Sequence, residues 1–300
     1  MTSPPPGLAA GSGTPAAEIA IDEGLVRALI AAQHPDLADL DVRPAASGWD
    51  NAMFMVGDDL AVRIPRRAAG APLILNEQRW LPALADQLPL PIPAPARLGA
   101  PGCGYPYAWS VVPWLLGAPA DLAVPAADQG PPLARFLRAL HRPPPPGAPR
   151  NPFRGVPLSD RAAAVEARMA RLGEAVAPEI QPIWRDALSA PLDSPSTWLH
   201  GDLHGRNVLV EAGRFSAVID WGDLCQGDAA TDLAAIWSLL PNGGSRKAAL
   251  DAYGASFDTV RRARGWAVFF GVMLLDAGQV DDPRLAAAGA ATLARVVEGP

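Results

Sequence analysis

Residues 200–223, HGDLHGRNVLVEAGRFSAVIDWGD, bring together two histidines, one asparagine and three aspartates. Carboxylate and amide oxygens are the ligands that a hard cation such as Mg²⁺ binds in proteins. A carboxylate beside a metal-bound phosphate can also accept the proton of an attacking hydroxyl. The residue types in this segment therefore indicate a site for a metal ion, a phosphate and a proton acceptor.

The same segment has the pattern of a β-hairpin. NVLV and SAVID are short apolar runs separated by EAGRF, which predicts a turn at residues 212–215. Pairing Val208 with Ile219 would set Asn207 opposite Asp220 at the open end, with their Cα atoms about 5 Å apart. At that separation both side chains could reach one Mg²⁺ ion.

Asp202 lies five residues before Asn207, in a loop that contains two glycines. Its carboxylate could act as the base beside a magnesium–phosphate site. An alternative interpretation takes His200 and His204, four residues apart, as zinc ligands of a metallohydrolase. The neighbouring glycines disfavour the helix that this spacing needs, and a third ligand is not evident, but the zinc hypothesis stays open.

The composition limits the classes of function. A net charge of −6 argues against nucleic-acid binding, which usually needs a basic domain, and an ordinary acidic surface explains it as simply as a cationic substrate does. Lys247 is the only lysine among 25 basic residues, so arginine must take any role that needs another cation. Two cysteines are too few for a disulfide framework, and we expect both to be reduced and at least partly buried.

Two stretches bear on where the protein is located: the first 20 residues and an apolar run near the C-terminus. Residues 1–20 lack the basic start and apolar core of a signal peptide and are predicted to be a disordered tail. Residues 265–278 are apolar but too short to span a bilayer, which predicts a buried helix. We therefore expect a cytoplasmic protein with neither a membrane nor a nucleic-acid partner.

The elements that must position these residues fall into two groups. The first is a sheet-rich part, with helices at 22–34 and 71–88 and strands at 40–48, 51–58, 60–67, 93–101 and 107–117. The second is mainly helical, with helices at 133–141, 159–172, 180–190, 231–240, 245–255, 258–278 and 283–299. This predicts an α+β, bilobal chain: a tail at 1–20, an N-terminal lobe at 21–112, and a hinge with a helical C-terminal lobe at 113–300.

The catalytic segment resembles a known family. Asp202 and Asn207 have the D-x-x-x-x-N spacing of a kinase catalytic loop, and Asp220 stands where kinases place a second magnesium aspartate. HGDLHGRN followed by VIDWGD resembles the aminoglycoside phosphotransferase family more than protein kinases, which have H-R-D and D-F-G. Further segments occur in the order of that family: SGWDNAMFMVGDDLAVRIPRR, NEQRWLPAL, WSVVPWLLG, FLRALH and GDAATDLAAIW.

The resemblance implies a protein-kinase-like fold and transfer of the γ-phosphoryl group of ATP, with Mg²⁺, to a hydroxyl of a small molecule. It implies that Asp202 is the catalytic base and that Asn207 and Asp220 bind Mg²⁺. It places Arg63 where kinases carry the strand lysine that contacts the nucleotide phosphates, with Glu77 as its partner on a helix.

The resemblance also implies contacts with the rest of the nucleotide and with the acceptor. Residues 47–53, including Ser47 and Asn51, would form the turn over the phosphates. The backbone from Val112 to Trp114 would be the hinge that meets adenine. His204 and Asp223 are possible substrate contacts, although His204 could equally brace the hairpin. Nearby, an Asp232 that caps a helix and an Asp228 that braces the catalytic loop are expected.

Several alternatives stay open. Arginine at position 63 fits bidentate phosphate contact, but it would also fit an inactive, nucleotide-binding regulatory protein. The acceptor could be an antibiotic such as an aminoglycoside, or a metabolite such as a sugar or an amino alcohol. The sequence does not choose between ATP and GTP, and it does not fix the oligomeric state.

Overall fold

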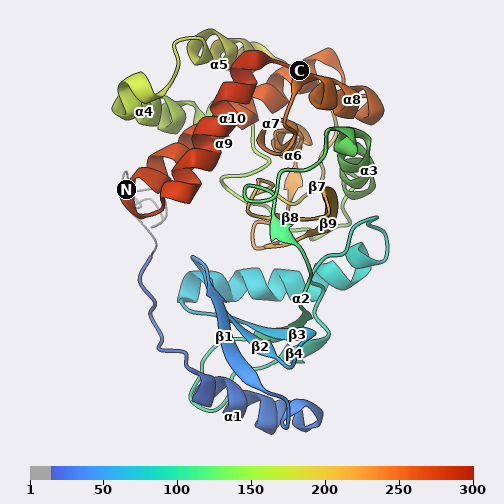
Figure 1. Ribbon diagram of the computed structural model, residues 1–300, viewed down its shortest axis with the longest axis vertical. Helices are drawn as coiled ribbons and strands as arrows, with labels where there is room; N and C mark the ends of the chain where they lie inside the picture. Colours follow the sequence, from blue (N-terminus) through green and yellow to red (C-terminus); the bar gives the residue numbers. More distant parts are fainter. Residues whose placement is uncertain (1–14) are drawn as a thin grey trace. The chain divides into compact units, whose positions relative to one another are not determined.

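The computed structural model describes residues 15–300 and divides them into two compact units (Figure 1). Residues 15–117 together with Ser216–Leu224 form one unit, here called the sheet unit. Ala118–Phe215 together with Cys225–Pro300 form the other, here called the helical unit. The first segment of the sheet unit ends at residue 117, within the stretch that the sequence indicated as the hinge and start of the helical lobe. The second strand of the predicted hairpin and the residues just after it, Ser216–Leu224, also belong to the sheet unit.

The predicted tail at residues 1–20 is only partly described. Residues 1–14 lie outside the described residues. Within the described part, the backbone N–H groups of Glu18 and Ile19 donate to the carbonyl of Arg66, at 2.9 and 3.2 Å. Glu18 and Ile19, in the predicted tail, are therefore bonded within the sheet unit, so this part of the prediction of a disordered tail was wrong.

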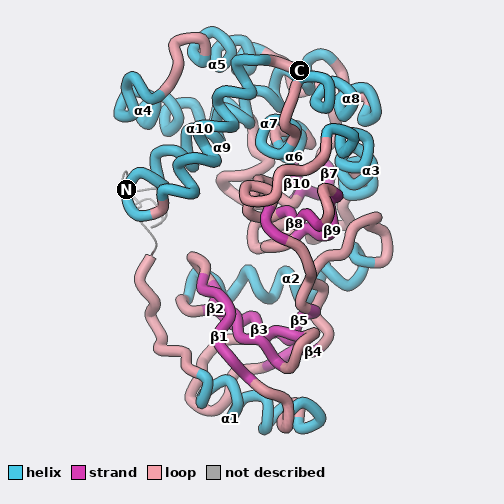
Figure 2. The backbone as a smooth tube through the Cα atoms, viewed as in Figure 1, coloured by secondary structure: helices cyan, strands magenta, loops and turns pink. Residues whose placement is uncertain are grey.

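The sheet unit contains a five-stranded antiparallel sheet in the order β1-β2-β3-β5-β4 (Figure 2). Every strand and helix predicted here is present, with ends shifted by a few residues. The elements are α1 (Glu23–Gln33), β1 (Val42–Ser47), β2 (Asn51–Val56), β3 (Leu60–Pro65), α2 (Ala71–Ala85), β4 (Arg97–Gly99) and β5 (Trp109–Pro113).

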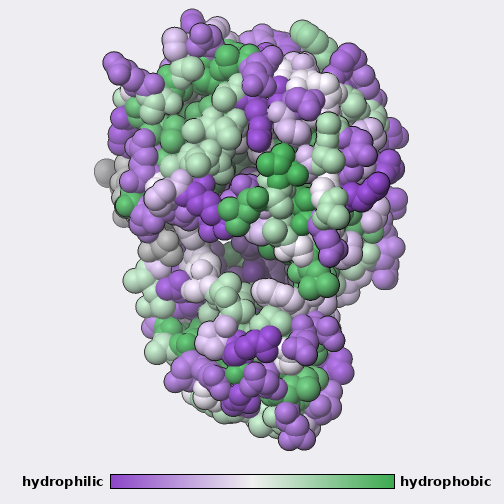
Figure 3. All heavy atoms as spheres, in the orientation of Figure 1, coloured by the Kyte–Doolittle hydropathy of each residue, from purple (hydrophilic) through white to green (hydrophobic). Residues whose placement is uncertain are grey.

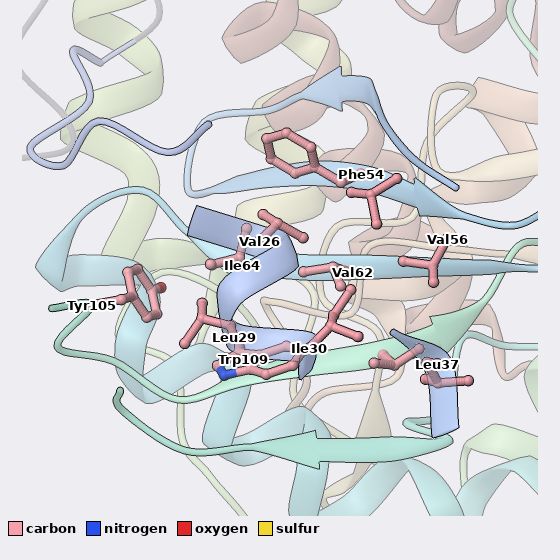
Figure 4. Close-up of a cluster of buried hydrophobic side chains, with 12 residues drawn as sticks. Val26, Leu29, Ile30, Leu37, Phe54, Val56, Val62, Ile64, Tyr105 and Trp109 are labelled. Atoms are coloured by element: carbon pink, nitrogen blue, oxygen red, sulfur yellow. The ribbon is translucent and has the colours of Figure 1, made fainter. Parts of the chain in front are cut away.

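The two faces of this sheet bury different side chains because successive residues of a strand point to opposite sides. Phe54 and Val62 pack with Leu29 of α1 on one face, in the cluster drawn in Figure 4. Each such buried side chain contributes about 2 kcal/mol. Met55 and Ala61 lie on the other face, in a small separate cluster with a third buried strand residue. Arg63, next to Val62 in β3, shares this second face.

The helical unit holds the remaining elements, and Figure 2 shows how its short strands lie among the helices. Its helices are α3 (Gly130–Leu140), α4 (Ala162–Leu172), α5 (Ile180–Ser189), α6 (Ala230–Leu233), α7 (Ala235–Leu239), α8 (Gly243–Tyr253), α9 (Phe257–Asp281) and α10 (Pro283–Glu298). Its strands are β6 (Ala118–Pro119), β7 (Thr197–Leu199), β8 (Val208–Glu211) and β10 (Cys225–Gly227); β9 (Arg214–Val218) begins here and ends in the sheet unit.

The predicted helices of this unit are all present, with one division. The helix expected at 231–240 is two short helices, α6 and α7, that meet at Ala234. The apolar run at 265–278 lies within α9, where most of its residues are buried, as predicted. Gly278 lets α10 approach α9 closely, because a Cβ there would lie 2.2 Å from the backbone nitrogen of Ala286.

The predicted hairpin exists, but its turn is shorter than expected. Strands β8 and β9 are neighbours in a sheet with β6. Ala212 and Gly213 alone form the turn, with φ values of 48° and 76°, which suit the two-residue turns that match the twist of a hairpin. A two-residue turn sets Glu211 opposite Arg214, so the predicted turn at 212–215 and the register derived from it were wrong.

The surface of the described residues is mixed in polarity on the side that is drawn. Hydrophilic and hydrophobic side chains are interspersed on the face shown in Figure 3. Among the described residues, no helix is both long enough and apolar enough to cross a bilayer. Both cysteines are free thiols, and Cys225 is buried as expected, whereas Cys103 is exposed because it lies in a surface turn with a φ of 50°.

Candidate active site

The loop between β7 and β8 carries the predicted catalytic residues of the helical unit. It is not helical, and Gly201 in it has a φ of 85°, a backbone conformation that favours glycine. Strand β7 pairs with β10, and the backbone N–H of Asp121 donates to the carbonyl of Gly205 at 3.2 Å. The loop is therefore held at both ends by the body of the helical unit.

Asp202 is surrounded by three side chains of the helical unit. Nη2 of Arg154 lies 3.1 Å from its Oδ1. Nε2 of His204 lies 3.3 Å from its Oδ2, and the amide Nδ2 of Asn207 lies 3.3 Å from the same oxygen. The Asp202 side chain keeps 21% of its surface exposed, so its carboxylate is fixed and still open to a substrate hydroxyl.

The hydrogen bonds assign the orientation of His204 and Asn207. The backbone N–H of Arg206 donates to Nδ1 of His204 at 3.2 Å, so Nδ1 is the acceptor and Nε2 donates to Asp202. Nδ2 of Asn207 also donates to the backbone carbonyl of Asp202 at 2.9 Å. That bond directs the other end of the amide, Oδ1, away from Asp202, and Oδ1 is the atom that a hard cation would bind.

The electrostatics keep Asp202 ionised. Burial by itself raises the pKa of the Asp202 carboxyl, but the contacts with His204 and the charge of Arg154 outweigh it and hold that pKa well below its usual range. A weakly basic carboxylate binds and orients a hydroxyl before it accepts the proton. The His204 side chain contacts Asp202, and its roles as a substrate contact or as a brace of the hairpin stay predictions.

Asp232 of α6 braces the catalytic loop. Its Oδ2 accepts the backbone N–H of His200 at 2.7 Å, and its Oδ1 accepts that of Gly201 at 2.9 Å. His141 lies 3.4 Å from the same carboxylate and 2.8 Å from the hydroxyl of Tyr253. The capping role expected of Asp232 was wrong, because its buried carboxylate accepts hydrogen bonds from the loop and caps none of the described helices.

Asp228 has the role expected of Asp232. Its Oδ1 accepts the backbone N–H of Ala230 at the start of α6, at 3.1 Å. Nε of Arg262 donates to its Oδ2 at 2.7 Å. Asp228 therefore caps a short helix and ties it to α9, and the loop-bracing role expected of it stays a prediction.

In the sheet unit, Arg63 connects the two acidic residues assigned to the nucleotide. Its Nε and Nη2 donate to the two carboxylate oxygens of Glu77, at 2.9 and 2.8 Å. Its Nη2 also donates to Oδ1 of Asp220 at 2.9 Å. The predicted pair of Arg63 with Glu77 is present, in the two-bond geometry that only a guanidinium can make with a carboxylate.

This ion-pair group is buried at one end and open at the other. The side chains of Arg63 and Glu77 are 12% and 4% exposed, whereas that of Asp220 is 55% exposed. Burial lowers the pKa of the Arg63 guanidinium, but the charges of Glu77 and Asp220 outweigh this and raise it above its usual value. Asp220 is thus the end of the group that a cation in solvent could reach.

A tight turn after β9 holds Asp220. Asp220 has a φ of 59°, which is uncommon for a residue other than glycine. The backbone N–H of Val218 donates to the carbonyl of Pro91 at 3.0 Å. Nε1 of the buried Trp221 donates to the carbonyl of Val218, also at 3.0 Å. These bonds fix a strained backbone that aims the Asp220 carboxylate at Arg63.

The turn assigned to the phosphates is shorter than residues 47–53. Ser47 ends β1 and Asn51 begins β2, so the turn consists of residues 48–50. Nη1 of Arg66 donates to Oγ of Ser47 at 3.0 Å and to the carbonyl of Gly48 at 2.9 Å. Oδ1 of Asn51 is buried and has no hydrogen-bond partner among the described residues.

The proposed hinge, Val112 to Trp114, provides an apolar surface and a backbone N–H that is already hydrogen-bonded. Val112 is buried with Met55 and Ala61, a surface that suits the face of a nucleotide base. The backbone N–H of Trp114 already donates to the carbonyl of Asp59 at 2.8 Å, so a backbone bond from Trp114 to a base would use its carbonyl. The Trp114 side chain is 38% exposed.

Some site residues were not found from the sequence. Arg154 contacts Asp202 from 48 residues away, and no motif marks it. Asp232, 32 residues from His200, was noted in the sequence but with another role. Asp223 is partly buried in the turn that follows Asp220.

The described residues contain no cluster of three or more His, Cys, Asp or Glu side chains placed to hold a metal, so the zinc hypothesis gains no support.

Comparison with known proteins gives one family and a consistent set of folds. The model of the phosphotransferase enzyme family matches residues 41–266. No curated protein matches the chain. The GDP complex of an aminoglycoside 2'-phosphotransferase-IIIa is similar over 92% of this chain and 99% of its own, with a TM-score of 0.71 and 17% identity.

Two further solved structures have the same fold. The macrolide 2'-phosphotransferase MphH from Brachybacterium faecium is 24% identical, with a TM-score of 0.58, and the match covers 91% of this chain and 98% of that one. The streptomycin–ATP complex of APH(2")-IIa is 15% identical, with a TM-score of 0.58 and coverage of 85% and 91%. At these identities the matches show the kinase-like α+β fold expected from the sequence.

Proposed function

Because the chain belongs to the phosphotransferase enzyme family, we propose that it moves the γ-phosphoryl group of ATP to a hydroxyl of a small molecule. The observation that carries this proposal is Asp202. Its carboxylate is partly open and held by Arg154, His204 and Asn207. Such a fixed, ionised carboxylate orients the acceptor hydroxyl for in-line attack and takes its proton as the new bond forms.

The residues assigned to the nucleotide fit a magnesium-bound triphosphate. Bound Mg²⁺ would neutralise charge that develops on the phosphate oxygens. Asp220 offers an exposed carboxylate for the ion, and Asn207 offers its amide Oδ1. Arg63, fixed by Glu77, keeps a guanidinium at the place where kinases use a lysine, which supports an active enzyme over a regulatory protein.

The acceptor and the nucleotide base are open within this proposal. GDP and ATP complexes both occur among the structurally similar proteins, so the nucleotide could be ATP or GTP. An antibiotic such as an aminoglycoside is the acceptor that the family suggests, and several similar structures are of aminoglycoside phosphotransferases. A metabolite such as a sugar or an amino alcohol is the alternative.

The test is release of ADP from Mg-ATP, measured across aminoglycosides, macrolides, sugars, hydroxy acids and amino alcohols. We expect release with one class, and an Asp202→Asn variant should lower kcat by about a hundredfold or more. Asp251→Asn, at a surface residue of α8 paired with Lys247, is the control and should leave kcat unchanged. Tight nucleotide binding without transfer to any acceptor would favour the regulatory protein instead.

A further inference from the structure

Arg161, just before α4, is a buried cation without the usual partners. The residue is 7% exposed, and its Nε has no hydrogen-bond partner among the described residues. Its guanidinium lies over two aromatic rings, 5.1 Å from the centre of Phe153 and 5.7 Å from that of Phe269. Ring contacts attract a cation without accepting its N–H groups, and Nε is the guanidinium nitrogen that is fully buried without a hydrogen bond.

The surroundings of Arg161 are positively charged. Burial lowers the pKa of the Arg161 guanidinium, the charges of Arg154 and Arg168 lower it further, and exposed Asp160 offsets only part of this. Asp276, the buried carboxylate nearby, is already engaged: Arg168 lies 3.4 Å and Arg171 2.6 Å from its Oδ2. Arg161 therefore lies in a positive electrostatic environment that Asp276 does not relieve.

Two other buried arginines of the helical unit have the charged or polar partners that Arg161 lacks. Arg262 is paired with Asp228 at 2.7 Å and with Asp193 at 2.9 Å. Arg246 donates to the carbonyl of Gly299 at 2.7 Å. Removing a charge from water is costly unless the protein pairs it, so an arginine kept in the state of Arg161 indicates a ligand that supplies the negative charge.

The cluster adjoins the candidate base. Arg154 lies 5.3 Å from the centre of the Phe269 ring, which also carries Arg161, and its Nη2 is 3.1 Å from Asp202. Met273, the next turn along α9, lies 3.9 Å from the same nitrogen and is only partly buried. A group bound to these arginines would therefore be close to the carboxylate that handles the acceptor hydroxyl.

We propose that Arg161 and Arg154 form a subsite for a carboxylate of the acceptor, so that the substrate is a hydroxylated acid. This rests on the proposed function and names its substrate class. Two aspartates beside the loop are already neutralised and so attract a cationic acceptor less, because Asp121 is paired with Arg284 and Asp282 with Arg206. A carboxylate would instead meet two arginines and leave the hydroxyl to Asp202.

The experiment uses acceptors that share a skeleton and differ in charge: glucuronate, glucose and glucosamine, and glycerate with its primary amide. ADP release is measured with the wild type and with Arg161→Gln. We expect kcat/KM for an acid to exceed that for its neutral or cationic counterpart by about tenfold or more. Arg161→Gln should remove most of this preference and leave the KM for ATP unchanged. Equal or better use of the neutral or cationic compound would overturn the subsite.

A binding measurement decides the case in which no acceptor is phosphorylated, an outcome that counts against the proposed function. Calorimetry with glucuronate and glycerate, at constant ionic strength, should then still show saturable binding that Arg161→Gln abolishes. Absence of such binding would overturn the subsite as well. The matched control is Arg185→Gln, an exposed arginine of α5, which should change neither result.

A purely structural role for Arg161 predicts a different pattern. Arg161→Met removes an unpaired buried cation, so a ligand-binding role predicts a higher midpoint of thermal unfolding together with loss of the preference for acids. If the ring contacts with Phe153 and Phe269 were the reason for the arginine, Arg161→Met would lower the midpoint. The preference for acids would then survive, and the subsite would be wrong.

Discussion

At the scale of single residues, the candidate site is built from ionised groups whose positions depend on their partners. Asp202 takes its state from His204 and Arg154, and Arg63 takes its direction from Glu77. In each case a short polar contact, in an environment with little water, sets the charge or orientation of the side chain more than its residue type does. The consequences can be measured by removing one partner at a time.

Replacing Arg63 by methionine should cost about 3 kcal/mol of unfolding free energy, because it leaves Glu77 as an uncompensated buried charge. Glu77 is 4% exposed on its side chain and makes two hydrogen bonds to Arg63. Urea denaturation would measure the change. The control is Arg43→Met on β1, whose ion pairs are exposed, and it should change stability by less than about 0.5 kcal/mol. A similar small change for Arg63→Met would contradict the buried pair.

The pH dependence of the reaction should reflect the depressed pKa of Asp202. A carboxylate with a lowered pKa stays ionised as the pH falls through about 4, the usual value for aspartate, and is protonated only below it. We therefore expect no loss of kcat/KM from this group between pH 8 and about pH 4. His204→Phe removes one cause of the shift and should move the acidic fall of kcat/KM to higher pH. An unmoved profile would show that His204 does not control Asp202.

At the scale of elements, short helices and turns do the positioning. The four-residue helix α6 carries Asp232 beneath the catalytic loop, and Asp228 caps that helix while Arg262 of α9 holds it. In the sheet unit, the turn after β9 fixes Asp220 in a conformation that few residues adopt. Long helices such as α9 supply the rigid support, and the site itself sits on the irregular connections.

Asp232→Asn tests this positioning. The amide keeps the shape of the side chain, but it can no longer accept hydrogen bonds from both His200 and Gly201, which should cost about 2 kcal/mol. We expect kcat to fall while the KM for ATP stays within about twofold, because only the catalytic loop loses its support. Steady-state kinetics and urea denaturation would show this. Unchanged kcat in a destabilised variant would limit Asp232 to a folding role.

At the scale of the whole molecule, the chain divides its proposed tasks between two units. Arg63, Glu77 and Asp220, assigned to the nucleotide, belong to the sheet unit, whereas Asp202 and Asn207 belong to the helical unit. Segment Ser216–Leu224 follows β8 in sequence yet is part of the sheet unit. The chain thus passes from one unit to the other and back within the catalytic segment itself.

Binding of Mg-ATP should stabilise the molecule against heat. A ligand at about a hundred times its Kd stabilises a protein by about 2.7 kcal/mol, which should raise the melting temperature by several degrees. Chelation of Mg²⁺ should remove most of this shift, and Asp220→Ala should do the same in the presence of Mg²⁺. Scanning calorimetry with and without chelator would show it. An equal shift without Mg²⁺ would argue against the metal role of Asp220.

The sequence by itself predicted most of the elements, and the family resemblance supplied the proposed chemistry. Hydrophobic periodicity predicted α1, α2, α9 and the strands, because an element that buries one face repeats its apolar residues at the period of that element. The catalytic loop was recognised because its residues lie within one short segment. The pairing of Arg63 with Glu77 was expected from the family pattern and is present.

Only the tertiary structure decided which distant residues reach the site. The turn of the hairpin depended on two backbone conformations, at Ala212 and Gly213, that apolar patterning does not specify. Arg154 and Asp232 contact the catalytic loop through packing between segments far apart in sequence, so the loop-bracing role of Asp232 could not be read from the sequence. Which charged side chains neutralise one another depends on which residues are neighbours in space. Those neighbours are set by the packing of the whole core.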